Sequence, residues 1–431
     1  MTIDHAARRE KIARALNLSD EILLVGAGLP LPKPEVSDQM LPFIAHQEYY
    51  YLTGLGDAPG GVLAFDPRDR KAKAAGGGWV SFVPEVTEAE RIWEGREQLP
   101  GELLDQLPRW IQSRARRKVA ALGAPPDAAG IDAAASAAAR DALAHCRRVK
   151  DPGEIERMRR CAAATAAAYT VVQPFLRPGV SERRIQIELE AEYFRQGAQK
   201  TGYDTIVGVG AQSAVFHGSP SPARFAFEGD FILIDSGAEM DRYVIDVTRT
   251  YVAGTASPFQ KDLHQVVRHA LARATERCRP GAEWKDIHFG AAIDLVGGLI
   301  AMGLMRGKPD SLVEQDAHTL FFPHGIGHML GLGVRDAGGL EPGRTRDPRP
   351  SLKTLRMDLI LRPGYIVTVE PGLYFIPAIL HDSARRTKYR DCVDWTEVDK
   401  HLRLGGVRIE DNILVTDGAP EILTAAIPRQ L

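Results

Sequence analysis

Two aspartates in otherwise apolar, strand-like sequence constrain the fold of this chain most strongly. Residues 231–252 have the sequence FILIDSGAEMDRYVIDVTRTYV, in which Asp235 ends a continuous apolar run. Asp246 lies in the alternating stretch that follows, and Thr248 shares its face because side chains two apart on a strand point the same way. Both strands have the composition of buried strands, so the two carboxylates must be either compensated or exposed.

The turn between the two strands decides how close these aspartates come. We take Gly237–Arg242 as the turn. An unbulged hairpin centred just after Met240 then puts Asp235 directly opposite Asp246. Their Cβ atoms would be about 4.5–5.5 Å apart, and such a pair persists only with a cation between the carboxylates. Hairpin register is uncertain by one residue, so the alternative that one aspartate is exposed or caps a turn stays open.

A second segment, residues 321–336, carries two histidines in glycine-rich sequence. His324 and His328 are four positions apart in FFPHGIGHMLGLGVRD. Gly325 and Gly327 disfavour a regular helix, so we expect a tight loop that leads into a helix or strand. No Glu follows the first histidine, which excludes an H-E-x-x-H zinc helix. A structural role is the common one for such a pair, whereas glycines that let backbone approach a ligand favour function.

Two more carboxylates occur at or within strand-like runs. Tyr365–Val369 has the composition of a strand, and Glu370 follows it directly before a Pro-Gly turn. In GGVRIEDNILV, residues 405–415, Arg408 and Glu410 share one face of a strand. Taken alone, Glu370 is explained as a solvated residue, and Arg408 with Glu410 as a structural ion pair.

Together these segments predict a metal centre. The acidic candidates are Asp235, Asp246, Glu370 and Glu410, and His328 is the natural fifth ligand. Four carboxylates carry a charge of −4, which two divalent cations would cancel. Oxygen ligands with one imidazole suit Mn²⁺ first, with Co²⁺ or Zn²⁺ as alternatives. Two such ions about 3.5–4 Å apart can bridge and deprotonate a water at neutral pH.

Composition argues against several other classes. The chain has 54 Lys and Arg against 56 Asp and Glu, so no net basic field attracts nucleic acid or anionic lipid. Its four cysteines form no C-x-x-C pair, as expected in a reduced, cytoplasmic protein, and Cys146 and Cys161 in Ala-rich sequence are expected to be core residues. The most apolar stretch, around Leu295–Leu304, is too short to span a membrane. We therefore expect no nucleic-acid and no membrane partner.

A domain boundary is expected near residue 148. Asp151 suits a helix N-cap, with Pro152 at the first helical position and Glu154 at the third. Helical periodicity follows in several later stretches, residues 155–175, 181–197, 258–278 and 285–305.

The first part of the chain mixes helix and strand signals. Gly61–Phe65 and Trp79–Val83 are predicted strands, and Glu102–Ile111 a helix. The basic residues that follow, up to Lys118, are expected to form a solvated helix end. Residues 119–146, rich in Ala with interspersed Pro and Gly, are expected to connect the two domains.

The motifs resemble those of the pita-bread metallopeptidases, in the prolidase and aminopeptidase P branch. The matching stretches are IDSGAEMDRYVIDVTRT, PHGIGHMLGLGVRD, VTVEPGLY and GGVRIEDN, in that order, and SAVFHG with His217 precedes them. HQEYYYLTGLGDAPGGVLAFDP resembles the additional N-terminal domain of this branch. The resemblance implies an α+β fold with an α/β domain at residues 1–148 and a creatinase/aminopeptidase-like pita-bread catalytic domain at residues 149–431.

The resemblance also assigns roles to residues. The two-metal site would be formed by Asp235, Asp246, His328, Glu370 and Glu410. Glu370 would be the general base, and His217 and His324 would line the pocket and steady the scissile carbonyl. Arg408 would orient the ligands and the substrate.

Two features bear on substrate choice. The long stretch between Glu370 and Glu410 is similar to that of prolidases, whereas aminopeptidase P proteins are typically shorter there. The family's V-H-D is replaced here by Val334-Arg335-Asp336. Arg335 is always charged and could grip a peptide carboxylate bidentately, so we hypothesise altered substrate selection with the metal set intact.

The leading expectation is a prolidase, an enzyme that hydrolyses the Xaa-Pro bond of dipeptides with a metal-bridging hydroxide. The alternative is a Xaa-Pro aminopeptidase that acts on longer peptides. A non-peptidase binding protein of the same fold is a third reading, but such relatives lose ligand residues, and every ligand position is filled here. The resemblance further implies a homodimer, in which Tyr49-Tyr50-Tyr51 either reach a neighbouring subunit's site or lie in the core of their own domain.

Overall fold

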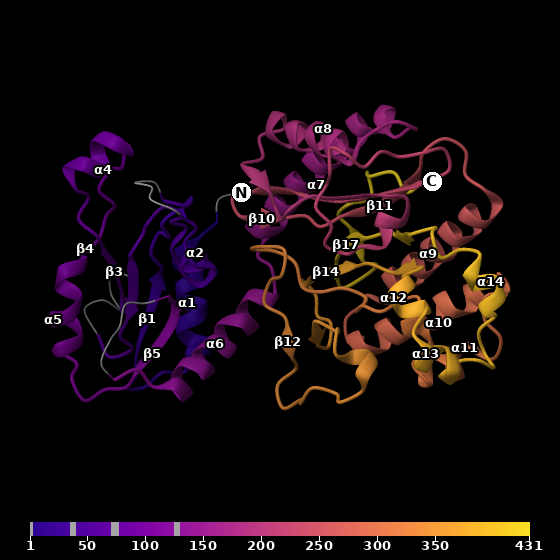
Figure 1. Ribbon diagram of the computed structural model, residues 1–431. Coiled ribbons are helices and arrows are strands. Elements are labelled where there is room, and N and C mark those ends of the chain that lie inside the picture. The colour runs from indigo at the N-terminus through magenta and orange to yellow at the C-terminus, as the bar shows by residue number, and fades with distance from the viewer. Residues whose placement is uncertain (1–2, 35–39, 70–76, 125–129) are drawn as a thin grey trace. The chain divides into compact units, whose positions relative to one another are not determined.

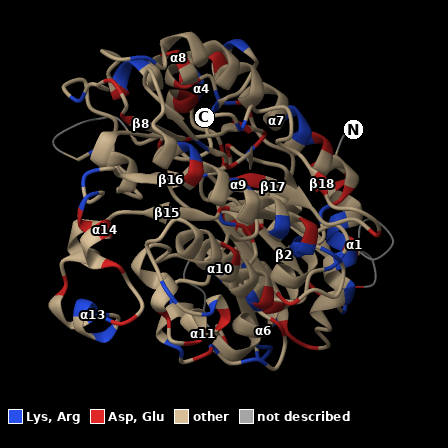
Figure 2. Ribbon diagram, turned by 90° about the vertical axis from the view of Figure 1, so that its right-hand side faces the viewer, with Lys and Arg blue, Asp and Glu red and all other residues tan. Residues whose placement is uncertain are grey.

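The computed structural model describes residues 3–34, 40–69, 77–124 and 130–431 (Figure 1). The chain divides into two compact units, Thr2–Arg147 and Arg148–Leu431. Lys, Arg, Asp and Glu alternate along the elements of both units, in keeping with the near-neutral net charge (Figure 2).

A five-stranded sheet organises the N-terminal unit, with strand order β4-β3-β2-β1-β5. Its strands are β1 (Ile22–Ala27), β2 (Val62–Phe65), β3 (Trp79–Val83), β4 (Glu102–Leu103) and β5 (Val119–Ala124). Its helices are α1 (His5–Leu16), α2 (Gln47–Thr53), α4 (Glu88–Trp93), α5 (Leu107–Gln112) and α6 (Ala133–Arg148). Apolar side chains of β1, β2 and β3 form a small core with Leu107 and Val119.

The predicted strands β2 and β3 are confirmed, but three other expectations for this unit are wrong. Glu102 and Leu103 are not helical, because they pair with β3, and α5 begins only at Leu107. The Ala-rich segment is not a mere connection. Its first residues form β5, which pairs in parallel with the buried strand β1, and its alanines form α6, as their high helix propensity favours.

The third correction concerns the basic residues after α5. The side chains of Arg114 and Arg117 are not solvated helix-end cations, because both form ion pairs with the buried Asp66.

Tyr49 and Tyr51 of α2 are buried within their own unit.

Four long helices of the C-terminal unit lie where periodicity predicts them. They are α7 (Pro152–Val172), α8 (Glu182–Arg195), α9 (Pro258–Arg277) and α10 (Trp284–Ala301). Asp151 is the N-cap of α7 and forms the predicted capping box with Glu154. Shorter helices follow as α11 (Pro309–Glu314), α12 (Pro377–Leu380), α13 (Ser383–Lys388) and α14 (Trp395–Asp399).

The strands of this unit form the small sheets β10-β9-β6, β11-β8-β7, β14-β17-β18, β12-β13 and β15-β16. Their bounds are β6 (Lys200–Thr201), β7 (Ile206–Val209), β8 (Phe231–Asp235), β9 (Ala238–Met240), β10 (Tyr243–Val244), β11 (Thr248–Val252), β12 (Gly339–Leu340), β13 (Met357–Asp358), β14 (Ile366–Val369), β15 (Gly372–Tyr374), β16 (Gly406–Arg408), β17 (Asp411–Leu414) and β18 (Glu421–Ile422). Of these strands, β11, β14 and β17 lie between α7 and α8 on one side and α9 and α10 on the other (Figure 1). The main core packs α9 and α10 against β14 and β17.

The hairpin that carries the two aspartates differs in register from the prediction. Asp235 pairs with Thr248, not with Asp246, so the expected pairing is wrong by two residues on one strand. The turn is centred between Asp241 and Arg242, whose φ angles of 51° and 68° are those of a type I′ turn. This turn type matches the twist of the flanking strands, which explains why the chain turns one residue later than expected.

A close backbone approach accompanies this register. A Cβ atom on Gly237 would lie 1.7 Å from the Ile245 carbonyl oxygen, so only glycine fits. Because Asp235 pairs with Thr248, Asp246 is not directly opposite Asp235 but two residues away along the neighbouring chain segment.

Among the described residues, no helix has the length and apolar character that crossing a membrane requires.

Candidate active site

One cavity of about 970 Å³ in the C-terminal unit gathers the side chains predicted to be functional. It is lined by His217, Asp235, Asp246, His324, His328, Arg335, Glu370, Arg408 and Glu410, among others. These residues come from segments far apart in the sequence, which strand pairing brings to one place. The cavity also exposes Arg183, Glu190, Asp204 and Arg356, which sequence reasoning did not select.

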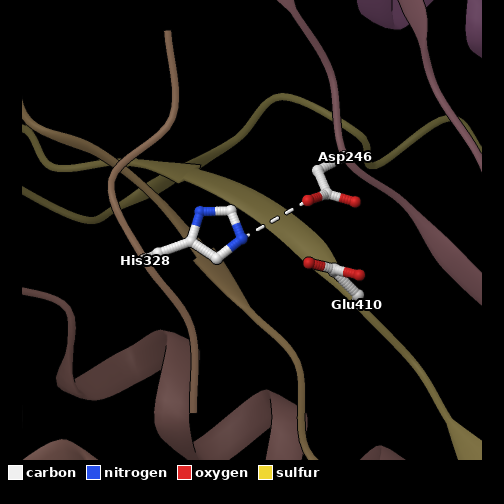
Figure 3. A group of neighbouring side chains, drawn as sticks. All are labelled: Asp246, His328 and Glu410. Carbon is white, nitrogen blue, oxygen red and sulfur yellow. Dashed lines mark ion pairs between the residues drawn. The ribbon is translucent and has the colours of Figure 1, made fainter. Parts of the chain in front are cut away.

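Asp246, His328 and Glu410 form the tightest cluster in the cavity. All three are buried, and one ligand atom from each lies within 4.8 Å of the others. Figure 3 shows the imidazole and the two carboxylates pointing toward one another. His328 Nε2 lies 3.4 Å from Asp246 Oδ2. These are oxygen and nitrogen donors of the kind that bind divalent metal ions.

Asp235 and Glu370 border this cluster without belonging to it. Tyr203 Oη donates to Asp235 Oδ1 at 2.7 Å, and Arg408 donates to the other oxygen of the same carboxylate. Glu370 follows β14, and its backbone N–H donates to the Ile326 carbonyl at 2.8 Å. The five predicted ligands thus line one cavity, with three of them in direct proximity.

A glycine fixes the loop that presents His328. Gly327 has a φ of +154°, and a Cβ atom there would lie 2.1 Å from the Thr368 carbonyl oxygen. His328 N donates to Thr368 Oγ1 at 3.1 Å, and Thr368 N donates to the His328 carbonyl at 2.9 Å. The Gly-shaped loop is therefore confirmed, and it runs as an extended segment along β14.

The imidazole itself is also oriented. His328 Nδ1 lies 3.0 Å from the Met329 carbonyl oxygen, so this nitrogen carries the proton. Nε2 is then a lone-pair donor that faces Asp246 and the cavity.

Arg408 pairs differently from the expectation for its strand. It forms no ion pair with Glu410 within the described residues. Its guanidinium instead bonds Asp235, with further hydrogen bonds to Thr248 Oγ1 at 2.9 Å and Tyr374 Oη at 3.2 Å. Glu410 accepts a hydrogen bond from Thr248 Oγ1 at 2.8 Å. Thr248 therefore links the arginine and the carboxylate that sequence spacing suggested would pair directly.

The carboxylates of the cavity are electrostatically crowded. Burial raises the pKa of Glu370 to about 7, with Asp246 and Asp235 adding to the rise against the charges of His328 and Arg408. Burial, followed by the charge of Asp246, also raises the pKa of Glu410. Burial raises the pKa of Asp235 as well, although Arg408 opposes it. The ionised form of these carboxyl groups is unfavourable in the cavity, and a bound cation would stabilise it.

His324 differs from His328 in its surroundings. Burial, and then the charge of Arg408, lowers the pKa of His324 to about 3, so its imidazole is neutral. Its Nδ1 lies 2.8 Å from the Gly325 carbonyl oxygen and its Nε2 lies 2.9 Å from Tyr374 Oη. His217 is exposed at the cavity.

Comparison with known proteins agrees with this geometry. Residues 156–417 match metallopeptidase family M24, and residues 5–107 match the aminopeptidase P N-terminal domain. The chain belongs to metallopeptidase family M24. This membership implies divalent metal ions, and the donor set of Asp246, His328 and Glu410 fits such ions.

Relatives of this M24 protein cover almost its whole length. The Xaa-Pro aminopeptidase of Escherichia coli (strain K12) is 33% identical over 292 residues, which are 68% of this chain and 59% of the relative. A probable Xaa-Pro aminopeptidase of Coccidioides posadasii is 28% identical over 453 residues, covering 98% of this chain and 93% of the relative.

Solved structures are similar as well. Aminopeptidase P from E. coli with the inhibitor Pro-Leu has a TM-score of 0.79 at 25% identity and covers 100% of this chain and 97% of its own. Aminopeptidase PepP of Pseudomonas aeruginosa has the same TM-score and identity, with coverage of 99% and 96%. The predicted family and the α+β pita-bread fold with its additional N-terminal domain are confirmed.

Three side chains of this M24 site escaped sequence reasoning. Tyr203 bonds Asp235, Tyr374 links His324 to Arg408, and Asn412 receives and donates hydrogen bonds at the backbone of Asp246. Tyr374 follows Glu370 by four residues, so its proximity to an acidic candidate was the one available signal. Tyr203 has no neighbouring motif.

Proposed function

We propose that this protein is a Xaa-Pro aminopeptidase, which releases the N-terminal residue from peptides that have proline in second position. The observation that carries the proposal is the group of relatives of that name, among which the probable Xaa-Pro aminopeptidase of Coccidioides posadasii and the structure of E. coli aminopeptidase P align over nearly the whole chain, its N-terminal unit included. The bond before proline is a tertiary amide without N–H, so it needs a site dedicated to it.

The prolidase expectation is correspondingly weaker. It depended on the long stretch between Glu370 and Glu410. That stretch forms α12, α13 and α14, and of its described residues 371–407 none lines the cavity. The helices α12, α13 and α14, which account for the length of this stretch, do not line the cavity and have no direct means of limiting the substrate to dipeptides.

We propose that two divalent ions, Mn²⁺ by first choice, are held by the five predicted ligands, Asp235, Asp246, His328, Glu370 and Glu410. The support is their common cavity, the proximity of three of them, and the raised pKa of three carboxylates. Such ions, when bound, supply Lewis acidity and lower the pKa of water to near neutrality.

The chain's own residues would then handle protons and charge. Glu370 would accept and return a proton at its carboxylate as general base. His217 and His324 would steady the carbonyl oxygen as it gains negative charge. In the structure Nδ1 of His324 faces the Gly325 carbonyl oxygen and so carries the proton, and Nε2 accepts from Tyr374 Oη. Donation to the substrate oxygen would require this proton to move to Nε2.

Arg335 is proposed to influence which peptides are accepted. It is exposed at the cavity, next to Asp336, whose carboxylate is 1% exposed and lies 2.8 Å from Lys150 Nζ. This buried ion pair holds the backbone beside Arg335, so the side chain of Arg335 starts from a fixed point at the border of the cavity. The homodimer, the native metal and the compartment stay predictions.

The experiment that tests the proposal uses protein stripped with a chelator and restored with Mn²⁺. A mixture of a Xaa-Pro dipeptide and a matched Xaa-Pro-Xaa tripeptide is followed by mass spectrometry. We expect release of the first residue from the tripeptide. Loss of the dipeptide alone would indicate a prolidase, and an intact mixture with stoichiometric metal bound would refute the peptidase proposal.

A further inference from the structure

A second cavity of about 520 Å³ adjoins the catalytic one. It is formed mainly by residues 346–358, with Lys285 and Leu340. Arg356 lines both cavities, so this side chain lies in their common wall. Residues near Arg356 in the sequence line different cavities: Thr354 lines the catalytic cavity, and Lys353 lines the second one.

The lining of the second cavity contains more positively charged than negatively charged side chains. Its lining includes the cations Lys285, Arg346, Lys353 and Arg356 and the acids Asp347 and Asp358. Both acids already have partners, since Asp347 pairs with Lys285 at 3.4 Å and Asp358 with Arg344 at 2.9 Å. Within the described residues, no carboxylate lies at ion-pair distance from Arg346, Lys353 or Arg356.

The positive charge continues into the catalytic cavity. Burial lowers the pKa of Arg356, and the charges of Arg335 and Arg346 lower it further, against the opposing charge of Glu370. The guanidinium group of Arg356 is therefore near enough to those of Arg335 and Arg346 to be repelled by each of them. An anion placed among them would relieve this repulsion and accept bidentate hydrogen bonds.

The two cavities together thus have opposite charges at their two ends. Besides the proposed metal ligands, the catalytic end holds Asp204, a carboxylate outside that set, which the metal ions would not neutralise and which favours cations such as the free amine of a peptide. The far end holds Arg346 and Lys353, which favour anions. A peptide with a positive N-terminus and negative groups beyond the proline fits this polarity in one orientation.

We propose that the second cavity binds carboxylates of the peptide chain downstream of proline, so that this protein prefers substrates with acidic tails. The inference rests on the proposed aminopeptidase function. The carboxylate would contact Arg346 and Lys353, with Arg356 and Arg335 providing the passage from the catalytic cavity.

The first test compares three amidated peptides, Ala-Pro-Ala-Glu-Glu-amide, Ala-Pro-Ala-Gln-Gln-amide and Ala-Pro-Ala-Lys-Lys-amide, on the Mn²⁺-loaded protein. We expect the KM of the Glu peptide to be about tenfold below that of the Gln peptide, with the Lys peptide above both and similar kcat values. The difference should shrink at high salt, since exposed charges are screened. The free-acid form of the Gln peptide separates a terminal carboxylate from side-chain carboxylates. Equal KM values for all of these peptides would overturn the proposal.

The second test locates the effect. Arg346→Glu should raise the KM of the Glu peptide to that of the Gln peptide or above it, and change the KM of the Gln peptide by a much smaller factor. Arg385→Glu is the matched control, because Arg385 is exposed on α13, lines neither cavity and has no ion-pair partner among the described residues. An equal effect of both substitutions would mean a general charge effect and would also overturn the proposal.

Failure of the proposed function is distinguishable from failure of this inference. If none of the peptides is cleaved, the aminopeptidase proposal fails, and the cavity is then tested by binding alone. Fluorescence anisotropy of a labelled Ala-Pro-Ala-Glu-Glu-amide on the wild type and on Arg346→Glu gives this readout. Equal affinity of the two proteins would refute the acidic-tail site.

Discussion

Buried carboxyl groups have pKa values shifted in opposite directions in the two units of the molecule. In the N-terminal unit, burial tends to raise the pKa of Asp66, but hydrogen bonds from Arg117 and Arg114 lower it to about 2. In the catalytic cavity, burial raises the pKa of Glu370 to about 7 beside other acids. One carboxylate is fully compensated by its own chain, and the other is not.

The presence or absence of positively charged partners distinguishes carboxylates that stabilise the fold from those that are available for function. Asp66 is held by both nitrogens of the Arg117 fork at 3.0 Å, so its charge supports the fold. The carboxylates of the cavity have too few positively charged side chains of the protein as partners. This lowers the stability of the fold and leaves the carboxylates available to bind metal ions and protons. The same residue type therefore has a different role in each unit, and substitution should reveal it.

The largest effect is expected from Glu370→Gln. Loss of the general base and of a metal ligand should lower kcat for Xaa-Pro-Xaa cleavage by about 10³-fold or more. The metal-free variant should unfold at a urea concentration at least as high as the wild type at pH 8, because an uncompensated buried charge is removed.

Glu190→Gln is the matched control for this substitution. Glu190 lines the same cavity and undergoes the same chemical change, but it belongs to none of the predicted roles. Cleavage rates and metal content from mass spectrometry should stay near wild type. A kcat of Glu370→Gln within tenfold of wild type would contradict the assigned role.

The converse result is expected for Asp66→Asn in the N-terminal unit. The substitution leaves Arg114 and Arg117 without their shared carboxylate and should lower the free energy of unfolding of that unit by about 2 kcal/mol. The active-site kinetics on a tripeptide should not change. Asp105→Asn is the control, since Asp105 is exposed and has no ion-pair partner among the described residues. Unchanged urea midpoints for Asp66→Asn would refute the structural role of this cluster.

Part of this contrast was predictable from sequence. Carboxylates at the ends of apolar strands, together with His328, indicated a common cavity, because strand ends converge when strands pair. The hairpin register was not predictable, since Asp241 and Arg242 adopt positive φ angles without the Asn-Gly or Asp-Gly signal of a type I′ turn. The pairing of Arg408 with Asp235 also depends on which strands become neighbours, which spacing along one strand cannot reveal.

The Asp66 cluster was missed for the same reason. Arg114 and Arg117 lie about 50 positions from Asp66 in the sequence, so their basic run has the pattern of a solvated helix end. Local pattern identifies which side chains are unusual for their segment. It does not identify their partners, and the partners decide whether a charge stabilises the fold or remains available.

A pH titration should sharpen the comparison further, because the two units respond to acid in different ranges. Burial, and then the charges of His318, His324 and Arg349, lowers the pKa of His288 to about 3. Burial also lowers the pKa of His318 to about 4, although Asp316 opposes it. Neither ring nitrogen of either histidine has a hydrogen-bond partner within the described residues.

Both histidines are thus neutral in the folded chain and bind protons more readily after unfolding, near their ordinary pKa of 6.5. The contribution of these two histidines to the free energy of unfolding should therefore fall as pH decreases from about 6.5 toward 4. The raised pKa of Glu370 contributes with the opposite sign in the same unit, so the histidine contribution is isolated by substitution. Asp66 has a folded pKa below its ordinary 3.8, so its contribution is present above that value and is lost only below it.

The measurement is urea unfolding of the metal-free protein at pH 7 and pH 5, followed by tryptophan fluorescence and hydrogen exchange. His288→Phe, which keeps an aromatic ring in the core, should become more stable relative to the wild type as the pH is lowered from 7 to 5, because it removes a group that takes up a proton on unfolding. The N-terminal unit should change little over this interval. A pH dependence that is the same in His288→Phe as in the wild type would exclude this histidine as a cause.

The smallest effect is expected from Arg335→His, because Arg335 lies at the exposed border of the cavity and outside the crowded carboxylates. Its charge can contribute only through a solvated ion pair with substrate, so the ratio of dipeptide to tripeptide cleavage should shift by a few-fold at low salt. Metal content and folding should be unaffected, since the Lys150–Asp336 pair beside it stays intact. An unchanged ratio would mean that the substitution of the family's histidine by arginine does not select substrates, and the preference would then lie in the residues that surround the metal ligands themselves.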